Sequence, residues 1–588
     1  MLFEEAASFY EKLEGVSSRL EMIDILTEMF KKSTKDDIKE TIYMTQGILA
    51  PPFYGIEIGM AEKMVAQAIE VSYGYSKKEV ESNFKKTGDL GNTAEYFSCR
   101  SRMKRMSHAK FTLKEVFMQM QKIANTSGAG SQDAKVRMLS QLFAASTQLE
   151  ARYIARFAIG ALRLGAGDAT ILEALSKAYT GTREYKSELE NAYNICSDLG
   201  SVGYVLLSEG KKGIENFKVS LFSPIRPALA ERVATSEEIL EKMHGICAVE
   251  SKYDGFRAQV HMDRKHKRVE IFSRRLENTT KMFPELCEAA LKEVDAEEAI
   301  FEGEAIVYNQ VSDEFLPFQE TIQRKRKHGI EEKSRELPLT IFSFDIMYLD
   351  GKDLLNKPYI ERRKMLENII GKNGTISISD MAVVDSAKKL DMYFNDAISR
   401  GLEGVVAKDL NSSYVAGARK FSWIKLKRSY KGELSDTLDL VIVGYYLGKG
   451  QRTNFKFGGL LCATYNDSKD VFETVTRIGT GFSEKQMKVF EDLLNRIKGK
   501  KNARVVSVVE PDFWVEPKYV VTVKADEITR SPMHTCGAEG EGTGYALRFP
   551  RLISDGIRDD KSAEDATTSK EVISMYKMQK KGKMSDKL

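Results

Sequence analysis

One lysine in this chain has a setting that suits covalent chemistry. It lies in the run Glu250-Ser251-Lys252-Tyr253-Asp254-Gly255-Phe256-Arg257. Its amine becomes a nucleophile when it loses its proton, which for a free lysine happens near pH ~10.4. Desolvation or neighbouring cations lower that pKa, and an activated lysine can divide one difficult reaction into two easier steps. Alone, Lys-x-Asp-Gly is more often a surface lysine before a turn, so the motifs that follow decide its meaning.

Two further lysines and two glutamates have the types that phosphate chemistry requires. Lys425 and Lys427 are two residues apart on an expected strand, which places both side chains on one face. Glu304 and Glu403 lie beside short apolar strand runs, where a strand end can fix a ligand. The hard cation Mg²⁺ requires carboxylate oxygen from one or two residues, together with phosphate and water. These four residues are therefore candidates for binding a phosphate and a divalent metal.

Several short motifs follow one another in a fixed order. They are Lys252-Tyr253-Asp254-Gly255, Phe272-Ser273-Arg274-Arg275-Leu276-Glu277, Phe301-Glu302-Gly303-Glu304, Phe342-Ser343-Phe344-Asp345, Gly401-Leu402-Glu403-Gly404-Val405-Val406-Ala407-Lys408, Trp423-Ile424-Lys425-Leu426-Lys427, Leu547-Arg548-Phe549-Pro550-Arg551 and Arg558-Asp559-Asp560-Lys561. In this order the set resembles the ATP-dependent DNA ligases, in particular the replicative type of archaea and eukaryotes. The resemblance extends over nearly the whole chain.

The resemblance implies a role for each candidate. Lys252 would attack the α-phosphate of ATP and carry AMP as a phosphoramide, while Lys425 and Lys427 would hold that phosphate and lower the pKa of Lys252. Glu304 and Glu403 would bind Mg²⁺, with Mn²⁺ or another divalent metal left open. The implied nucleotide-binding residues are Glu250, Arg257, Arg274, Glu304, Phe344, Arg419, Lys425, Lys427, Arg548 and Lys561.

More specific contacts follow from the same resemblance. Phe344 would stack on adenine, and Glu304 would also contact the ribose, with Glu302 a weaker candidate for the metal. Arg257 and Arg274 would contact the ribose and the 5′-phosphate of the nick. The terminal basic motif would close over the β- and γ-phosphates during self-adenylylation; it contains Arg548, Arg551, Arg558, Asp559 and Lys561. Arginine and lysine are natural partners of a triphosphate.

The elements that position these residues divide the chain into three expected domains. Residues 1–220 contain only two prolines and show apolar residues at helical spacing, which predicts an all-helical domain. The segment 223–227 contains two prolines and ends it. We therefore expect a multidomain α+β protein: a helical DNA-binding domain over 1–220, an adenylation α+β domain over 221–430, and a C-terminal domain over 431–588. The resemblance implies an OB-fold β-barrel for the last.

Alternation of apolar and polar residues predicts the strands. Phe256 to Met262 and Val269 to Ile271 read as a β-hairpin that carries the Lys252 run into a sheet. Further strands are expected over 300–308, 339–349 and 403–408, with helices between them. After residue 431, strands are expected over 439–446 and 471–478 and a helix over 483–497.

Composition limits the partners. The net charge of the 588 residues is only +4, so DNA contacts must come from local basic patches such as 102–105 and 323–328. Six scattered cysteines without CxxC spacing fit a reducing compartment and argue against a zinc site. The sequence has no long apolar run and no signal-peptide character at its start. We expect a cytoplasmic, nucleoid-associated monomer that does not bind membranes.

The expected function is the sealing of nicks in duplex DNA during replication, repair and recombination. The sliding-clamp docking motif of the family, a Gln followed by paired aromatics, is not evident at 101–107, so clamp binding stays open. RNA ligases and mRNA-capping enzymes would share the lysine motif, but the helical region and the runs 436–439 and 478–482 favour a DNA ligase. The intact set of catalytic residues disfavours a non-catalytic DNA-binding protein, and the lack of a cysteine cluster disfavours an NAD-dependent ligase. Labelling with ATP, NAD or GTP would separate these classes.

Overall fold

The fold is that of a computed structural model. The structure describes residues 1–588 with the exception of 17, 104–109, 163, 234, 310–313, 316–320, 325–328, 373, 401, 428–436, 448–456, 480–481, 483, 539–541, 559 and 586–588. The chain divides into two compact units. Unit 1 consists of Met1–Glu231, Ile246–Val383 and Lys408–Ile424, and unit 2 consists of Arg232–Gly245, Val384–Ala407 and Lys425–Leu588.

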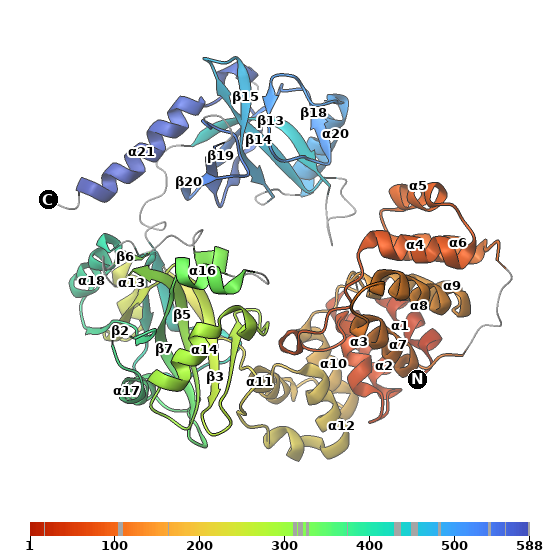
Figure 1. The fold of residues 1–588 in the computed structure, drawn as a ribbon, viewed down its shortest axis with the longest axis horizontal. Coiled ribbons are helices and arrows are strands. Elements are labelled where there is room, and N and C mark those ends of the chain that lie inside the picture. The colour runs from red at the N-terminus through yellow and green to blue at the C-terminus, as the bar shows by residue number, and fades with distance from the viewer. Residues whose placement is uncertain are drawn as a thin grey trace. The chain divides into compact units, whose positions relative to one another are not determined.

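The N-terminal region of unit 1 folds into helices, as predicted (Figure 1, red to tan). They are α1 Phe3–Glu14, α2 Arg19–Lys31, α3 Ile38–Gln46, α4 Glu62–Tyr73, α5 Lys77–Thr87, α6 Leu90–Cys99, α7 Leu113–Asn125, α8 Ser131–Ala145, α9 Gln148–Ala158, α10 Asp168–Thr180, α11 Lys186–Cys196 and α12 Leu199–Glu215. Capping boxes such as Thr147 with Glu150 fix helix starts by satisfying free backbone N–H groups. Large aromatic side chains that include Tyr10, Phe30 and Phe157 are fully buried between the helices.

A seven-stranded sheet in unit 1 is built around the predicted hairpin. Its strands are β3 Phe256–Asp263, β4 Arg268–Ser273, β5 Glu298–Asn309, β6 Glu314–Phe315, β7 Leu339–Leu349, β8 Lys352–Asp353 and β9 Ile376–Ile378. The order is β4-β3-β5-β7-β8, with β6 paired to β5 and β9 to β7. In the antiparallel hairpin Val260 is opposite Ile271, and both belong to the core of the sheet. Helices α14 Pro284–Glu293 and α17 Tyr359–Ile369 pack on its strands (Figure 1).

A second sheet has the strand order β1-β12-β11-β2-β10. These strands are β1 Leu229–Arg232, β2 Cys247–Lys252, β10 Met381–Val384, β11 Gly404–Lys408 and β12 Arg419–Lys427. In unit 2, α13 Ser236–Lys242 packs against α18 Ala387–Ser399. Helix α16 Ile330–Glu336 follows the 3-10 turn Ile322–Arg324.

The C-terminal part of unit 2 is an all-β domain with two helices (Figure 1, blue). Its main sheet runs β16-β18-β13-β14-β15-β17, with β19 paired to β13 and β22, and β20 and β21 form a separate pair. The elements are β13 Leu438–Tyr446, β14 Gly459–Asn466, β15 Val471–Ile478, α20 Glu484–Arg496, β16 Lys498–Gly499, β17 Val505–Val506, β18 Phe513–Val515, β19 Val520–Lys524, β20 Glu527–Ser531, β21 Gly544–Arg548, β22 Arg551–Ile557 and α21 Ser569–Ser585.

The observed architecture agrees with the predicted class: a helical N-terminal region, a mixed α+β middle and a C-terminal β domain. Predicted strands over 300–308, 339–349, 439–446 and 471–478 correspond to β5, β7, β13 and β15. Among the described residues, no helix is both long and apolar enough to cross a bilayer.

Candidate active site

Lys252 is the last residue of β2, where the chain leaves one sheet and enters another. We predicted that the hairpin would carry the lysine, but the hairpin begins only at Phe256 and the lysine belongs to the preceding strand. The turn between them requires a glycine, because a Cβ at Gly255 would lie 2.2 Å from the backbone oxygen of Ala305. Tyr253 anchors the same turn by stacking on Phe342, with ring centroids 4.4 Å apart. The turn that follows the half-buried Lys252 is thus held by a close backbone approach at Gly255 and by the stacking of the Tyr253 ring.

Glu250 lies two residues before Lys252 on β2 and forms a buried ion pair. Its Oε1 accepts a hydrogen bond from the Nζ of Lys408 at 3.0 Å, and both side chains are almost fully buried. The hydroxyl of Tyr359 donates to the same oxygen, and a guanidinium nitrogen of Arg363 lies 3.7 Å away. A buried carboxylate is stable only when paired in this way. Glu250 and Lys252 share a face of β2, because side chains alternate along a strand.

Lys408 connects this ion pair to a group of aromatic rings. Its Nζ donates to the backbone oxygen of Phe344 at 2.9 Å. It also lies 4.8 Å from the ring centroid of Phe344, 4.7 Å from that of Tyr359 and 4.3 Å from that of Trp423. Burial lowers the pKa of Lys408, against the opposing attraction of Glu250. Phe344 itself is only half-buried.

Arg257 projects from β3 beside Phe344, with its guanidinium 5.4 Å from the ring centroid. Its side chain donates to the backbone oxygen of Ala228 at 2.7 Å and to the carboxylate of Glu302 at 2.5 Å. Glu302 is buried, and it also accepts from Gln259 and Tyr414. Both of its oxygens are therefore used inside the protein, which makes Glu302 a support for Arg257 and weakens it as a metal candidate.

Glu304 lies directly opposite Arg257 in the β3–β5 pairing. Unlike Glu302, its side chain is only half-buried. Close packing of the strands at this point depends on Gly303, where a Cβ would lie 2.3 Å from a methyl carbon of Ile341. The Phe301-Glu302-Gly303-Glu304 motif thus contains one fully buried glutamate, Glu302, and one that is only partly buried, Glu304.

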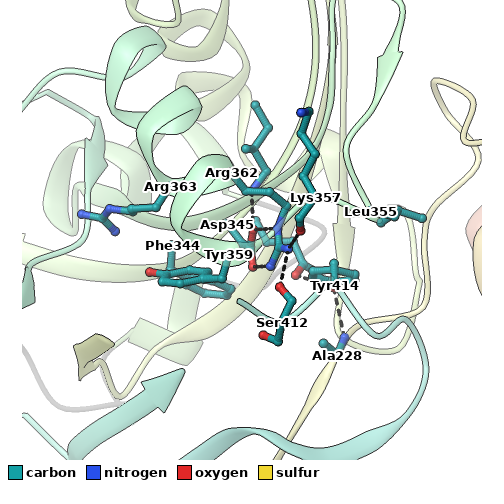
Figure 2. Close-up of polar contacts among 12 residues, drawn as sticks. Ala228, Phe344, Asp345, Leu355, Lys357, Tyr359, Arg362, Arg363, Ser412 and Tyr414 are labelled. Carbon is teal, nitrogen blue, oxygen red and sulfur yellow. Dashed lines mark hydrogen bonds and ion pairs between the residues drawn. The ribbon is translucent and has the colours of Figure 1, made fainter. Parts of the chain in front are cut away.

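Asp345 and Arg362 form a second buried ion pair behind Phe344, and Figure 2 shows how Arg362 reaches two loops. The guanidinium donates to the two carboxylate oxygens at 2.8 and 3.0 Å, and both side chains are fully buried. It also donates to the backbone oxygens of Lys357 and Ser412. Burial alone would raise the pKa of Asp345, but Arg362 outweighs burial and holds the pKa below its usual value. The pair fixes β7 just beyond Phe344.

The sequence prediction did not include Lys408, Tyr359, Arg362, Arg363 or Tyr414 as site residues. Lys408 stood in a quoted motif, and its place at the end of an apolar strand was a usable signal. The other four carry no local signal, because their partners lie far away in the sequence, as with Tyr359 and Glu250.

Four further predicted residues are Arg274 and Arg419 in unit 1 and Lys425 and Lys427 in unit 2. Arg274 is exposed in the turn after β4. Arg419 begins β12, and its side chain lies outside the described residues. Lys425 and Lys427 share one half-buried face of β12, whereas Ile424 and Leu426 on the opposite face are fully buried. The alternation agrees with the period expected from sequence.

Within unit 2, Glu403 already faces a cation. The Nζ of Lys427 donates to its Oε1 at 2.6 Å, and both side chains are about one-fifth exposed. Gly404 has a φ of 148°, and a Cβ there would lie 2.1 Å from the backbone oxygen of Leu426, so this glycine lets β11 approach β12 closely. A divalent cation bound by Glu403 would take the place of the Lys427 ammonium at this carboxylate, which is partly open to solvent. In the part of the chain that the structure describes, no group of three or more His, Cys, Asp or Glu residues is placed to hold a metal.

The cations of the terminal motif are paired with acids of the same β domain. Arg548 donates to Glu527 at 2.7 Å, and Arg551 donates to Asp526 at 3.0 Å. Lys561 and Arg558 both contact Asp439, with Lys561 Nζ at 2.7 Å from a carboxylate oxygen. Asp559 lies outside the described residues.

The predicted basic patches are only partly described. Arg324 is fully buried and donates to Glu285, so it does not belong to an exposed patch; residues 325–328 lie outside the described residues. Arg102 pairs with Glu79 at 2.7 Å and lies over the ring of Tyr75, while residues 104–109 are not described.

Comparisons with known proteins cover the whole chain. A family model described as ATP dependent DNA ligase domain matches residues 227–427, DNA ligase N terminus matches 2–176, and ATP dependent DNA ligase C terminal region matches 453–561. A probable DNA ligase of Dictyoglomus thermophilum is 46% identical over 100% of this chain and 99% of its own. A DNA ligase of Sulfurisphaera tokodaii is 43% identical over 98% of each chain. The solved structure Pmar-Lig_Pre. covers 94% of this chain and 99% of its own with a TM-score of 0.54 at 16% identity, which is a likeness of fold alone.

Proposed function

The chain belongs to the family of ATP-dependent DNA ligases, and we propose that it seals nicks in duplex DNA with Lys252 as the residue that carries AMP. Nick sealing through an adenylate intermediate is the general activity of this family. The assignment to particular residues of this chain rests chiefly on one observation. Lys252 ends β2 on the same face as Glu250, whose ion pair with Lys408 is surrounded by Phe344, Tyr359 and Trp423.

The reaction then has three balanced steps. The deprotonated amine of Lys252 forms a bond to the α-phosphorus of ATP while the bond to the β-phosphate oxygen breaks and pyrophosphate leaves. The 5′-phosphate of the nick next displaces Lys252 from AMP, and the lysine regains its proton. Finally the 3′-hydroxyl attacks the activated 5′-phosphate, loses its proton and releases AMP. Phosphoryl transfer of this kind depends mainly on positioning and charge neutralisation.

The aromatic and charged residues of unit 1 suit the nucleoside part of ATP. We infer that Phe344 stacks on the base, while Lys408 and Glu250 behind it offer one donor and one acceptor. Arg257 and Glu304, opposite each other on β3 and β5, are assigned to the ribose. Arg274, Arg419, Lys425, Lys427, Arg548 and Lys561 are assigned to the phosphates of ATP and of the nick.

The metal is assigned to Glu304 and Glu403. Both are partly exposed carboxylates, and a metal at Glu403 would replace the ammonium of Lys427 that its oxygen contacts in this structure. A bound Mg²⁺ or similar ion would neutralise charge on the phosphate oxygens. We further propose that the enzyme acts as an intracellular monomer on nicked double-stranded DNA, and that the helical region supplies much of the DNA contact.

A labelling experiment tests the covalent step. Purified protein incubated with α-labelled ATP and Mg²⁺ should acquire acid-labile label, and Lys252→Arg should acquire none because guanidinium stays protonated. The matched control is Lys265→Arg, at an exposed position in the turn between β3 and β4. Full labelling of the Lys252→Arg variant would show that another residue carries AMP. Parallel incubations with labelled NAD and GTP would identify the nucleotide.

A further inference from the structure

Two cations of the terminal motif converge on one acid, Asp439. Lys561 Nζ lies 2.7 Å from Oδ2 of Asp439, and Arg558 Nη1 lies 3.4 and 3.3 Å from its two carboxylate oxygens. Thr522 completes the arrangement, since its hydroxyl donates to Oδ1 at 2.6 Å. The other two arginines of the motif contact other acids, Arg548 with Glu527 and Arg551 with Asp526.

The backbone holds Asp439 and both cations in place. Asp439 lies on β13 directly opposite Thr522 on β19. Its N–H donates to the hydroxyl of Thr567 at 2.9 Å, and the N–H of Thr567 donates back to its carbonyl oxygen at 2.8 Å. The N–H of Arg558 donates to the backbone oxygen of Val520 at 2.8 Å, also on β19. Asp439 and Arg558 are therefore both joined to β19, and the N–H of Lys561 donates to the backbone oxygen of Arg558 at 3.3 Å.

The side chains differ in exposure in an informative way. The carboxylate of Asp439 is 13% exposed, whereas Lys561 and Arg558 are 31% and 33% exposed. Burial alone would raise the pKa of Asp439, but the hydrogen bonds from Lys561 and Thr522 outweigh it and hold the pKa below its usual value, so the carboxylate is ionised near neutral pH. Arg558 also pairs with Asp560, which is 63% exposed and therefore strongly screened by water. The carboxylate of Asp439 is therefore more buried than the two cations that contact it.

Cations that are immobilised in advance can strengthen the binding of an anionic ligand. A free lysine or arginine side chain loses conformational entropy when it is immobilised. If that loss occurs before a ligand arrives, the ligand binds more tightly. A polyphosphate would meet two cations already held at a fixed separation.

We propose that Asp439 is a positioning residue for polyphosphate: from β13 it holds Lys561 and Arg558 in the orientation that receives the β- and γ-phosphates of ATP. The inference rests on the proposed role of the terminal motif in self-adenylylation. It adds a residue to which the motif resemblance assigns no role, and it places that residue in one step of the reaction. Asp439 does not touch the phosphate; it acts through the two cations.

The test is Asp439→Asn, which keeps the shape of the side chain and removes its charge. Single-turnover self-adenylylation is measured against ATP concentration, and the reverse reaction of adenylylated enzyme is measured against pyrophosphate concentration. We expect the concentrations of ATP and of pyrophosphate needed for half-maximal rate to rise about tenfold, with the maximal rates nearly unchanged. Sealing of a nick that already carries 5′-AMP should stay within about twofold, because no polyphosphate takes part in that step. Asp439→Glu should recover part of the loss.

Two further variants separate the inference from the function beneath it. Asp467→Asn removes an acid that pairs with the exposed Lys570 in the same β domain, and it should change none of these values. Lys561→Ala reports on the motif itself. If Lys561→Ala impairs the ATP and pyrophosphate reactions while Asp439→Asn leaves them unchanged or improves them, the positioning role is refuted and the proposed function stands. If Lys561→Ala impairs all steps equally, the role of the motif fails as well. If Asp439→Asn slows self-adenylylation and the sealing of the pre-adenylylated nick by the same factor, Asp439 only stabilises the fold.

Discussion

At the scale of single residues, the metal candidate Glu403 differs from Glu302 in what its oxygens contact. Glu302 is buried and holds Arg257, Gln259 and Tyr414. Glu403 is partly exposed and contacts the ammonium of Lys427. A partly exposed carboxylate can exchange an ammonium partner for a divalent ion, whereas a buried and fully engaged one cannot do so without breaking several hydrogen bonds.

Glu403→Gln should therefore reduce sealing by about 100-fold or more, since metal neutralisation acts on the transition state. Affinity for nicked DNA, measured by gel shift, should change little because it comes from phosphate contacts spread over the protein. The control is Glu361→Gln, which removes an acid paired with Lys357 on the exposed side of α17. A loss of DNA affinity as large as the loss of activity would contradict a metal role for Glu403.

At the scale of elements, β3 does more than carry Arg257. The ring of the fully buried His261 accepts a hydrogen bond at Nδ1 from the N–H of Phe222 at 2.9 Å, and Gln259 exchanges hydrogen bonds with both backbone groups of Ile225. The segment after the last N-terminal helix is thus attached to the central sheet by two polar side chains. Burial lowers the pKa of His261 to about 3, so the imidazole is neutral in the folded protein.

This attachment should weaken in acid. The pKa of His261 is about 6.5 once the ring is exposed and about 3 while it is buried. The contribution of the neutral, buried ring to the stability of the attachment is therefore complete above about pH 6.5 and is lost as the pH falls toward 3. The free energy of local opening should fall by about 2 kcal/mol between pH 7 and pH 5. Hydrogen exchange at the amides of Phe222 and Ile225, corrected for intrinsic rates, measures it. His261→Asn should remove the pH dependence, whereas His266→Asn, at an exposed turn, should preserve it; a flat wild-type profile would contradict the assignment.

At the scale of the whole molecule, the candidate residues are divided between the two units. Lys252, Glu250, Arg257 and Phe344 belong to unit 1, while Lys425, Lys427, Glu403 and the terminal basic motif belong to unit 2. In unit 2 the motif lies on β21, β22 and the segment that follows. A reaction with three steps does not need every residue in each step, and the leaving pyrophosphate is present only in the first.

An Arg548→Ala/Lys561→Ala double variant should consequently lose self-adenylylation by about 100-fold or more and retain most sealing of a nick that already bears 5′-AMP. Single-turnover assays on ATP with a plain nick and on the pre-adenylylated nick measure the two values. Arg504→Ala, which removes an arginine paired with Asp470 and Glu564 elsewhere in the β domain, is the control. Equal losses on both substrates would make the motif structural and remove its step-specific role.

The sequence by itself determined the elements and the chemical candidates. The sequence predicted the strands β5, β7, β13 and β15, β13 from its apolar and β-branched residues and β15 from period-two alternation. The spacing of two residues placed Lys425 and Lys427 on one face of β12, because strand geometry fixes which way successive side chains point. Local backbone geometry is contained in local sequence.

Only the tertiary structure decided which charges are buried and which partners they have. Lys408 and Glu250 are 158 residues apart in the chain, so no local pattern predicts their ion pair. Arg324 stood in the densest basic run of the sequence and is fully buried against Glu285. Lys252 was expected on the hairpin and instead ends a strand of the neighbouring sheet, because the turn at Gly255 carries the chain between sheets. Desolvation and charge pairing depend on atoms that are distant in the sequence, and only folding brings these atoms together.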